Sequence, residues 1–371
     1  MTHMRQDGMD YLDIPPPEHG EIVQVAPGVH WIRMPLPMAL DHINLWLLED
    51  FDPEDGSPTW TIVDTGMAGN LTKDLWTKIF EGPAAARRPA QLICTHYHPD
   101  HFGLAGWLVE TFGLIFRMTD REWTTASLLW RVPDEEFAVS QDRFLARHSV
   151  PREIRDFHLK RGNAYNMGVG RPPDMFLPID DGDVLAIGGR DWRVITVGGH
   201  TPAQAVLYCA ETNVLISGDQ ILPQISPIVS VWWYRSGVSP LPDFLASISK
   251  CRSLPADALV LPSHRQPFRG LHRRIDELLD HHRDRLQELR DGLREHGTLT
   301  SLQAKQILFA RIEDPGNFVF AVGETVAHLE HLVRTGEMTI ETRPDGTALY
   351  LPRRHAKPSE SEDEAVQELH F

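Results

Sequence analysis

Cysteine is scarce in this chain. Among 371 residues there are three, Cys94, Cys209 and Cys251, and their spacing matches no metal-binding or redox motif. Each lies in an apolar stretch, where a thiol behaves as a small hydrophobic side chain. The odd number and these surroundings exclude a disulfide-stabilised scaffold and predict buried thiols in a reducing compartment.

Long apolar runs are also missing. No stretch approaches the roughly 20 apolar residues that a membrane-spanning helix needs, and the N-terminus lacks the apolar core of a signal peptide. We therefore expect no membrane partner. Together with the reduced thiols, this predicts a cytoplasmic protein.

Positive charge is in short supply. The chain has 36 Lys and Arg against 52 Asp and Glu, a formal net charge of −16. Proteins that bind a nucleic-acid backbone need clustered Lys and Arg. This balance argues against a nucleic-acid partner and favours a small-molecule substrate. The length suffices for two domains with a large core, and a homo-oligomer remains open.

Metal-ligating side chains, by contrast, are concentrated in one short segment. His96, His98, Asp100 and His101 lie within six residues, between an apolar run typical of a strand (90–94) and a stretch typical of a helix (102–112). At the end of a strand, four such side chains face a common point. Imidazoles and carboxylates suit zinc and related first-row metals. The segment therefore predicts a metal site.

Three later residues have the same sequence context. His200, Asp219 and His264 each follow a strand-like run and enter a turn containing Gly or Pro. Four residues cannot complete the ligand shells of two metal ions, so these three are candidates for the remainder.

With these motifs the chain resembles the metallo-β-lactamase superfamily over roughly residues 20–290. The resemblance rests on the His-x-His-x-Asp-His run, the Gly-His-Thr turn at His200, the Ser-Gly-Asp turn at Asp219, the Ser-His pair at His264 and Asp64 at an early strand end. It implies an α/β fold, an αββα sandwich with the metals at one edge between two sheets. Asp219 stands where true β-lactamases carry Cys or Ser, which is similar to the glyoxalase II and lactonase branch.

The resemblance also implies a ligand set for two divalent metal ions. One metal would be held by His96, His98 and His200, the other by Asp100, His101 and His264, with Asp219 bridging them. Zinc is the first choice, with iron or manganese as alternatives. Asp64 would lie behind the ligands and hold their loop by hydrogen bonds.

Composition divides the chain into four parts. We expect a flexible leader at 1–19, a catalytic domain at 20–297, a small module at 298–354 and an acidic, disordered tail at 355–371. Within the catalytic domain, strands are predicted at about 21–26, 28–34, 43–48 and 59–64, and a helix capped by Asn70 at 70–80. Aromatic residues at helical spacing over about 119–164 predict a helical insertion, either a cap beside the metals or a packing element.

The module at 298–354 resembles a winged helix, with helices at 300–311 and 319–335 and a hairpin from 338 to 351. DNA binding would be the natural inference, but acidic residues outnumber basic ones there by one. The stretch 319–324, which would open the recognition helix, has no basic residue to meet phosphates. We therefore expect a role in packing or oligomerisation.

The ligand set predicts a metal-dependent hydrolase acting on ester, thioester or lactone bonds. Paired metals lower the pKa of bound water to about 7, so a metal-bridging hydroxide could attack a carbonyl carbon, and Asp100 could accept the transferred proton. The loop after Asp219 is apolar and aromatic, which suggests an acyl or aryl group near the metals. Its candidate substrate residues are Ile225, Trp232, Trp233, Tyr234 and Arg235, joined by Tyr208. Among them, Tyr234 or Tyr208 could donate to the oxyanion and Arg235 could hold a carboxylate.

Two other classes compete with this prediction. A phosphodiesterase or nuclease could use the same metal pair, although the acidic composition opposes it. A non-catalytic regulatory protein could act through the winged module, although the intact ligand set opposes that.

Overall fold

A seven-stranded sheet, called here the first sheet, is formed by the N-terminal half of the chain. The structure is a computed structural model that describes residues 4–6, 8–38 and 40–353; the expected acidic tail at 355–371 lies outside them. In spatial order the strands of the first sheet are β3 (Val23–Ala26), β4 (Val29–Pro35), β5 (His42–Phe51), β6 (Pro58–Val63), β7 (Arg88–Ile93), β8 (Ile115–Met118) and β9 (Leu177–Pro178).

Helices α1 (Asn70–Glu81) and α3 (Ala105–Phe112), with the short α2 (Pro99–Phe102), follow β6 and β7 along the chain. Strands β6 to β9 pair in parallel, and parallel neighbours need crossover connections of this kind. Strands β3 to β6 pair antiparallel. Alternate residues of β5 show both faces: Leu45 and Leu47 pack with Trp76 of α1, while Trp46 and Leu48 enter the core between the sheets.

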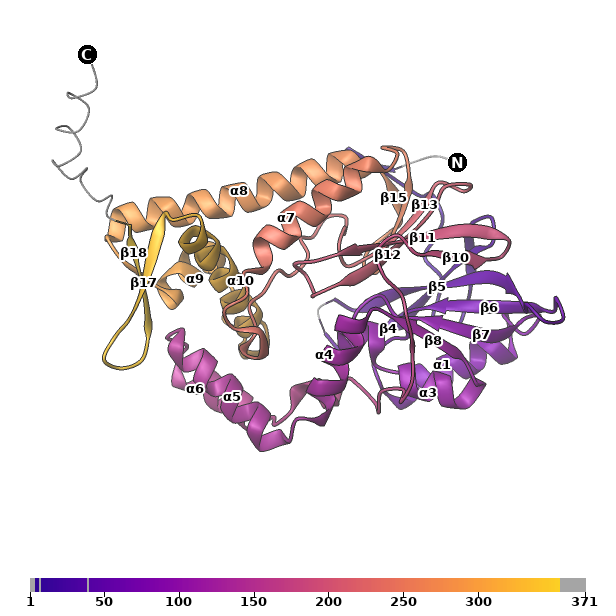
Figure 1. The fold of residues 1–371 in the computed structure, drawn as a ribbon, viewed down its shortest axis with the longest axis horizontal. Coiled ribbons are helices and arrows are strands. Elements are labelled where there is room, and N and C mark those ends of the chain that lie inside the picture. The colour runs from indigo at the N-terminus through magenta and orange to yellow at the C-terminus, as the bar shows by residue number, and fades with distance from the viewer. Residues whose placement is uncertain (1–3, 7, 39, 354–371) are drawn as a thin grey trace, which may run out of the picture.

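The second sheet comes mainly from the C-terminal half. Its order is β1 (Met4–Gln6), β2 (Met9–Tyr11), β15 (Phe268–Arg269), β14 (Leu259–Pro262), β13 (Val214–Gly218), β12 (Gln204–Cys209), β11 (Arg190–Val197) and β10 (Val184–Ile187). Helices α7 (Pro240–Lys250), with the 3-10 turn η3 (Cys251–Ser253), and α8 (Leu271–His296) cover its outer face. The expected αββα sandwich is confirmed (Figure 1).

Two expectations about the N-terminal half are wrong. Residues 9–11, expected to belong to a flexible leader, form β2, which pairs with β15 and buries Met9 and Tyr11. Pairing covers an otherwise open sheet edge, a tertiary effect that a three-residue strand does not announce in sequence. Helix α1 is capped by Gly69 and not by Asn70, and the cap has no side-chain hydrogen bond.

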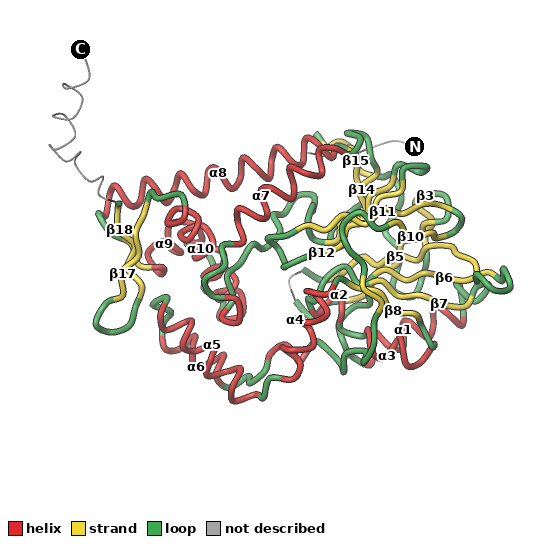
Figure 2. Tube along the Cα trace, in the orientation of Figure 1, coloured by secondary structure: helices red, strands yellow, loops and turns green. Residues whose placement is uncertain are grey.

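The helical insertion consists of α4 (Asp120–Arg131), α5 (Asp134–Arg147), α6 (Arg152–Leu159) and the 3-10 turn η1 (Ala164–Met167). The C-terminal module consists of β16 (Leu299–Thr300), α9 (Ser301–Phe309), α10 (Pro315–Arg334), β17 (Met338–Thr342) and β18 (Ala348–Pro352), with its strands in a small sheet. Both extend from the same side of the sandwich, as the helices and strands of Figure 2 show. No helix in the described ranges is long and apolar enough to cross a membrane.

Insertion and module contact each other through an apolar cluster. Leu145 and Val150 of the insertion pack with Phe318 and Val322 of α10 and with Val231 of the catalytic domain. Helix α10 is buried along most of its length, which supports the expected packing role.

Candidate metal centre

The candidate ligands gather at one edge of the sandwich. Strands β6 and β7 of the first sheet are parallel, and β11, β13 and β14 of the second sheet run in one common direction. Their carboxyl ends lead into Asp64, the His96–His101 segment and the turns that carry the three later ligands. The sheets are joined here by a hydrogen bond from Ala205 N–H to the Thr95 carbonyl, 2.9 Å long.

One group of side chains consists of His96, His98, His200 and Asp219, each offering an atom within 4.8 Å of the others. His96 Nε2 lies 3.1 Å from His98 Nδ1 and 3.3 Å from His200 Nε2. The second group consists of Asp100, His101 and His264. His264 Nε2 lies 3.4 Å from Asp100 Oδ2, and His101 Nε2 lies 3.7 Å from the same oxygen.

Asp219 lies between the groups. Its Oδ2 is 3.4 Å from His200 Nε2 of the first group. Its Oδ1 is 3.4 Å from His101 Nε2 and 3.5 Å from His264 Nε2 of the second. Each carboxylate oxygen therefore faces a different group.

These spacings fit metal ions. Ligand atoms about 2.0–2.1 Å from a zinc ion, at tetrahedral angles, lie about 3.3 Å from one another. Within the described residues, His101 Nε2 and Asp219 Oδ1 are buried without a hydrogen-bond partner, which is costly for polar atoms in the interior. A cation between them would satisfy both, so the donor set fits divalent metal ions.

The remaining ring nitrogens of four histidines are anchored. His101 Nδ1 donates to Asp64 Oδ2 at 2.8 Å, and His96 Nδ1 donates to Thr95 Oγ1 at 3.0 Å. His200 and His264 donate to backbone carbonyls, those of Ile228 at 2.7 Å and His42 at 3.0 Å. Such bonds fix the ring orientation and leave the other nitrogen free for a metal.

Asp64 occupies the place expected for it behind the ligands. Besides His101, it accepts hydrogen bonds from Thr95 N–H at 2.7 Å and Thr95 Oγ1 at 2.8 Å. Its φ of 64° lies in the left-handed region, which is strained for a residue with a side chain. The observed bonds support a role in holding the ligand segment, which remains a proposal.

The turn that leads to His200 depends on Gly199. Its φ is 99°, and a Cβ there would come within 2.3–2.5 Å of Phe244 on α7. Only glycine permits both this conformation and this close approach. Helix α7 thereby fixes the entry to the His200 turn.

Burial and neighbouring charges shift the histidine pKa values in opposite directions in the two groups. Burial lowers the pKa of His98 to about 3 and holds that of His96 well below its usual value; neutral imidazole is the form that binds metal. For His264, burial opposes protonation, but Asp219 and Asp100 raise its pKa to about 10. A divalent cation at the second group would replace such protons, so binding there releases protons.

Sequence reasoning missed two residues that hold the ligand loops. Asn44 of β5 donates from Nδ2 to the carbonyls of Pro262 and Arg265, which flank His264, at 2.9 and 2.7 Å. Glu122 of α4 reaches the loops of both His98 and His200. An Asn inside a strand and a Glu in the first turn of a helix are both ordinary in sequence, so neither gave a signal.

The aromatic loop after Asp219 lies beside the first ligand group. Tyr234 Oη is 2.7 Å from Tyr97 Oη, and the Tyr97 ring centroid is 4.7 Å from that of His98. The two tryptophans of the loop contact other parts of the chain. Trp233, in the 3-10 turn η2 (Trp233–Arg235), packs on Phe137 of the insertion, and Trp232 packs on Phe320 of α10.

The other substrate candidates fare less well. Tyr208 is not at the site: it belongs to the core under α7 and α8, and its hydroxyl donates to Asn213 Oδ1 at 3.2 Å. Strand β12 has its ligand-side end at Gln204, and Tyr208 lies near the opposite end of the strand, too far along it to reach the ligands. The carbonyl of Ile225 accepts a hydrogen bond from Arg274 of α8 at 2.8 Å. Arg235 is half-buried and close enough for its charge to act on the Tyr97 hydroxyl.

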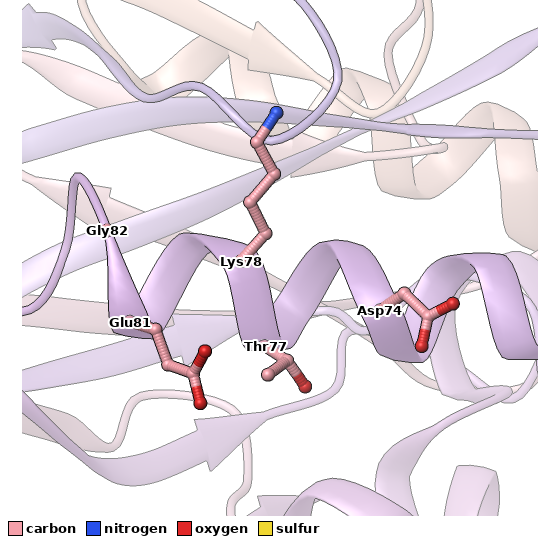
Figure 3. Close-up of a pocket in the computed structure, with 5 residues that line it drawn as sticks. All are labelled: Asp74, Thr77, Lys78, Glu81 and Gly82. Atoms are coloured by element: carbon pink, nitrogen blue, oxygen red, sulfur yellow. The ribbon is translucent and has the colours of Figure 1, made fainter.

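A separate hollow lies along α1, away from the ligands. It has a volume of about 460 Å³ and is lined by Asp74, Thr77, Lys78, Glu81 and Gly82 (Figure 3). Lys78 points away from the two carboxylates there and donates to the carbonyl of His19. None of the described residues that line the hollow belongs to either metal-ligating group.

Comparison with known families decides the assignment. The sequence model of the "Metallo-beta-lactamase superfamily" matches residues 40–264, which include Asp64 and all seven candidate ligands. The chain belongs to this superfamily. A second model, "Metallo-beta-lactamase-like, C-terminal domain", matches residues 286–353. Family and His/Asp cluster together identify a hydrolase that uses divalent metal ions.

Two individual relatives are similar to this superfamily member over most of its length, and a third over about half of it. The crystal structure of a beta-lactamase domain protein from Burkholderia ambifaria is 38% identical, covers 93% of this chain and 98% of its own, and has a TM-score of 0.85. The "Probable metallo-hydrolase YqjP" of Bacillus subtilis is 24% identical and covers 86% of this chain and 96% of its own. The human acyl-coenzyme A thioesterase MBLAC2 is 23% identical and covers 52% of this chain and 63% of its own.

Proposed function

We propose that this protein is a dinuclear metal-dependent hydrolase of thioesters, esters or lactones with an apolar acyl or aryl group. The observation that carries the dinuclear part is the position of Asp219, whose two oxygens face histidines of different groups. One metal ion would be held by His96, His98 and His200 and the other by Asp100, His101 and His264, with Asp219 shared.

When bound, such a pair would supply a nucleophile from water near neutral pH and polarise a carbonyl oxygen. The side chains of the protein would orient the ligands and accept the proton that the reaction releases. Asp100 is the candidate proton acceptor, because its side chain is 18% exposed while that of His101 is fully buried. A carboxylate at the open side of the ligand cluster can exchange protons with solvent or substrate.

The aromatic loop supports the choice of an apolar substrate group. Trp232, Trp233 and Tyr234 are neither fully buried nor fully exposed, and the Tyr234–Tyr97 contact brings the loop next to His98. Large apolar surface beside polar ligands is typical of small-molecule sites. Among the relatives, the human protein named as an acyl-coenzyme A thioesterase is consistent with this substrate class. The donor role of Tyr234 and the carboxylate-binding role of Arg235 stay predictions.

A substrate panel tests the proposal. Acyl-coenzyme A thioesters, acylglutathiones, lactones, aryl esters and a generic phosphodiester would be assayed with metal-loaded protein, with and without a chelator. We expect hydrolysis of a carbonyl substrate that the chelator abolishes and serine- or cysteine-directed reagents leave intact. Faster cleavage of the phosphodiester than of every carbonyl substrate would replace the proposed class with the phosphodiesterase class.

The apolar contact has its own test within this panel. Trp232→Ala or Trp233→Ala should lower kcat/KM for long acyl chains by roughly 30- to 150-fold, on the order of 2–3 kcal/mol, and affect short chains much less. Phe51→Ala is the matched control, since Phe51 is 50% exposed and lies at the opposite end of β5 from the ligand edge. Equal losses for long and short chains would make the loop purely structural.

A further inference from the structure

Glu122 is a buried carboxylate that reaches from the helical insertion into the catalytic domain. It lies in the first turn of α4 and is 0% exposed. The groups that act most strongly on its charge are two backbone N–H groups, Thr201 and His200, and none of these is a Lys or Arg side chain. A buried acid without a cation is expensive to keep, so its partners need an explanation.

Its two oxygens bind two different loops. Oε2 accepts a hydrogen bond from Tyr97 N–H at 3.1 Å, and Tyr97 is the residue between His96 and His98. Oε1 accepts one from Ala203 N–H at 2.6 Å, three residues after His200. One carboxylate thus joins the ligand segment of the first sheet to a ligand turn of the second.

A neighbouring residue strengthens the second contact. Thr119, the N-cap of α4, donates from Oγ1 to the carbonyl of Ala203 at 2.8 Å. Both polar backbone groups of Ala203 are therefore held by the start of α4. The start of the insertion therefore binds the backbone of the His200 turn, and the Ile228 carbonyl binds the His200 ring.

We propose that Glu122 is a positioning residue for the metal centre, which sets the separation between the His96–His98 segment and His200. Packing alone would be served as well by an apolar residue, whereas two backbone donors on separate loops require an acceptor with two oxygens. The helical insertion thereby becomes part of the metal site. The inference rests on the ligand assignment in the proposed function but not on the substrate.

The test measures metal binding by the full-length chain. Wild type, Glu122→Ala and Glu122→Gln would be titrated with Zn²⁺ in competition with a chromophoric chelator, and Co²⁺-loaded samples would give absorption spectra. Glutamine has the same size but turns one acceptor into a donor that faces an N–H group. We expect Glu122→Ala to weaken Zn²⁺ affinity about 10- to 100-fold, Glu122→Gln to weaken it less, and both to alter the Co²⁺ spectrum. The matched control is Glu136→Ala, on an exposed position of α5.

The outcomes separate this inference from the function it rests on. A wild-type chain that binds no metal overturns the ligand assignment itself. Folded Glu122 variants with wild-type Zn²⁺ affinity and Co²⁺ spectrum overturn the positioning role alone, even if their Tm is lower. Should Glu122→Ala not fold, amide hydrogen exchange of metal-free Glu122→Gln decides: residues 96–98 and 200–204 should exchange faster than in wild type, and unchanged exchange counts against the proposal.

Discussion

Asp219 is the residue that both halves of the proposed metal centre would share. Because its two oxygens face different histidine groups, Asp219→Ala should remove both metals, whereas loss of a ligand to one metal should spare the other. Elemental analysis of metal-replete wild-type protein should find close to two metals per chain, and of the variant close to none, with activity at least about 100-fold lower. His272→Ala is the control, since His272 Nε2 donates to the Leu254 carbonyl and, among the described residues, His272 belongs to neither ligand group. One metal in the wild type, or one retained by Asp219→Ala, would contradict shared ligation.

Glu324 of α10 is expected to make the stability of the chain depend on pH. It is buried, and Oε1 has no hydrogen-bond partner within the described part of the chain. Burial raises its pKa to about 8, with Arg285 opposing. Because the folded pKa lies above the usual value of 4.5, the stabilisation is present at low pH and is lost as pH rises toward 8.

Glu324→Gln should therefore gain stability over the wild type as pH rises. We expect similar Tm values at pH 5 and a higher Tm for the variant at pH 9, corresponding to a difference in the free energy of unfolding on the order of a few kcal/mol. Calorimetry of both proteins at several pH values measures this difference. Glu341→Gln, on the exposed face of β17, is the control, and a difference that does not change with pH would refute the assignment.

Some site residues could be predicted from the sequence, and others could not. The ligands His96, His98, Asp100 and His101 are adjacent in the chain, so their chemistry is visible without a fold. Glu122 acts only because α4 folds back over two loops far away in sequence, and nothing local marks it. Tyr208 was a wrong substrate candidate because the sequence does not say which end of β12 meets the ligands.

Among the elements, α10 packs closely against a loop of the catalytic domain. Val231 N–H donates to the Gly323 carbonyl at 3.1 Å, and a Cβ at Gly323 would come within 2.9 Å of the Val231 carbonyl and 3.1 Å of Ser230. The same loop carries Ile228, whose carbonyl orients His200. Packing of α10 and orientation of a candidate ligand are therefore connected.

Gly323→Val should separate α10 from this loop. We expect a loss of about 1–3 kcal/mol in the free energy of unfolding, from overpacking, together with weaker metal binding. Gly316→Ala in the first turn of α10 is the matched control, because its Cβ would meet only the Asp314 carboxylate at 3.3 Å. Denaturant unfolding and a Zn²⁺ titration of both variants measure the effects. Unchanged stability of Gly323→Val would contradict the close packing.

Elements with strong periodicity were predictable, and elements defined by tertiary contacts were not. The strands β3 to β6 lie in runs rich in apolar and β-branched residues, and the long α8 has buried apolar residues at helical spacing along most of its length. Strand β2 has three residues and exists because β15 offers an open edge, and the cap of α1 falls on Gly69 because the chain turns there. Neither fact is encoded in a window of neighbouring residues.

At the scale of the whole molecule, the C-terminal module completes the core. Leu299, Leu308, Leu332 and Tyr350 of the module belong to one apolar cluster with Leu289 of α8. Deleting residues 298–371 should expose this surface and cause aggregation or a change in oligomeric state, which size-exclusion chromatography would detect. A soluble, monomeric and fully active truncation would refute the packing role. Because α10 is buried, we also predict no salt-sensitive DNA binding by gel shift.

The distribution of the candidate ligands over both sheets has a consequence for synthesis of the protein. At about 5–20 residues per second, His264 is made roughly 10–30 s after His96. During that interval the growing chain holds His96, His98, Asp100 and His101 without their partners from the second sheet. Its Asp64–Thr95–His101 hydrogen bonds lie wholly in the early half, so this half can organise before the other exists. In the proposed ligand set, neither metal ion has all its ligands until His200, Asp219 and His264 have been made, so both sites become complete only after synthesis of the second sheet.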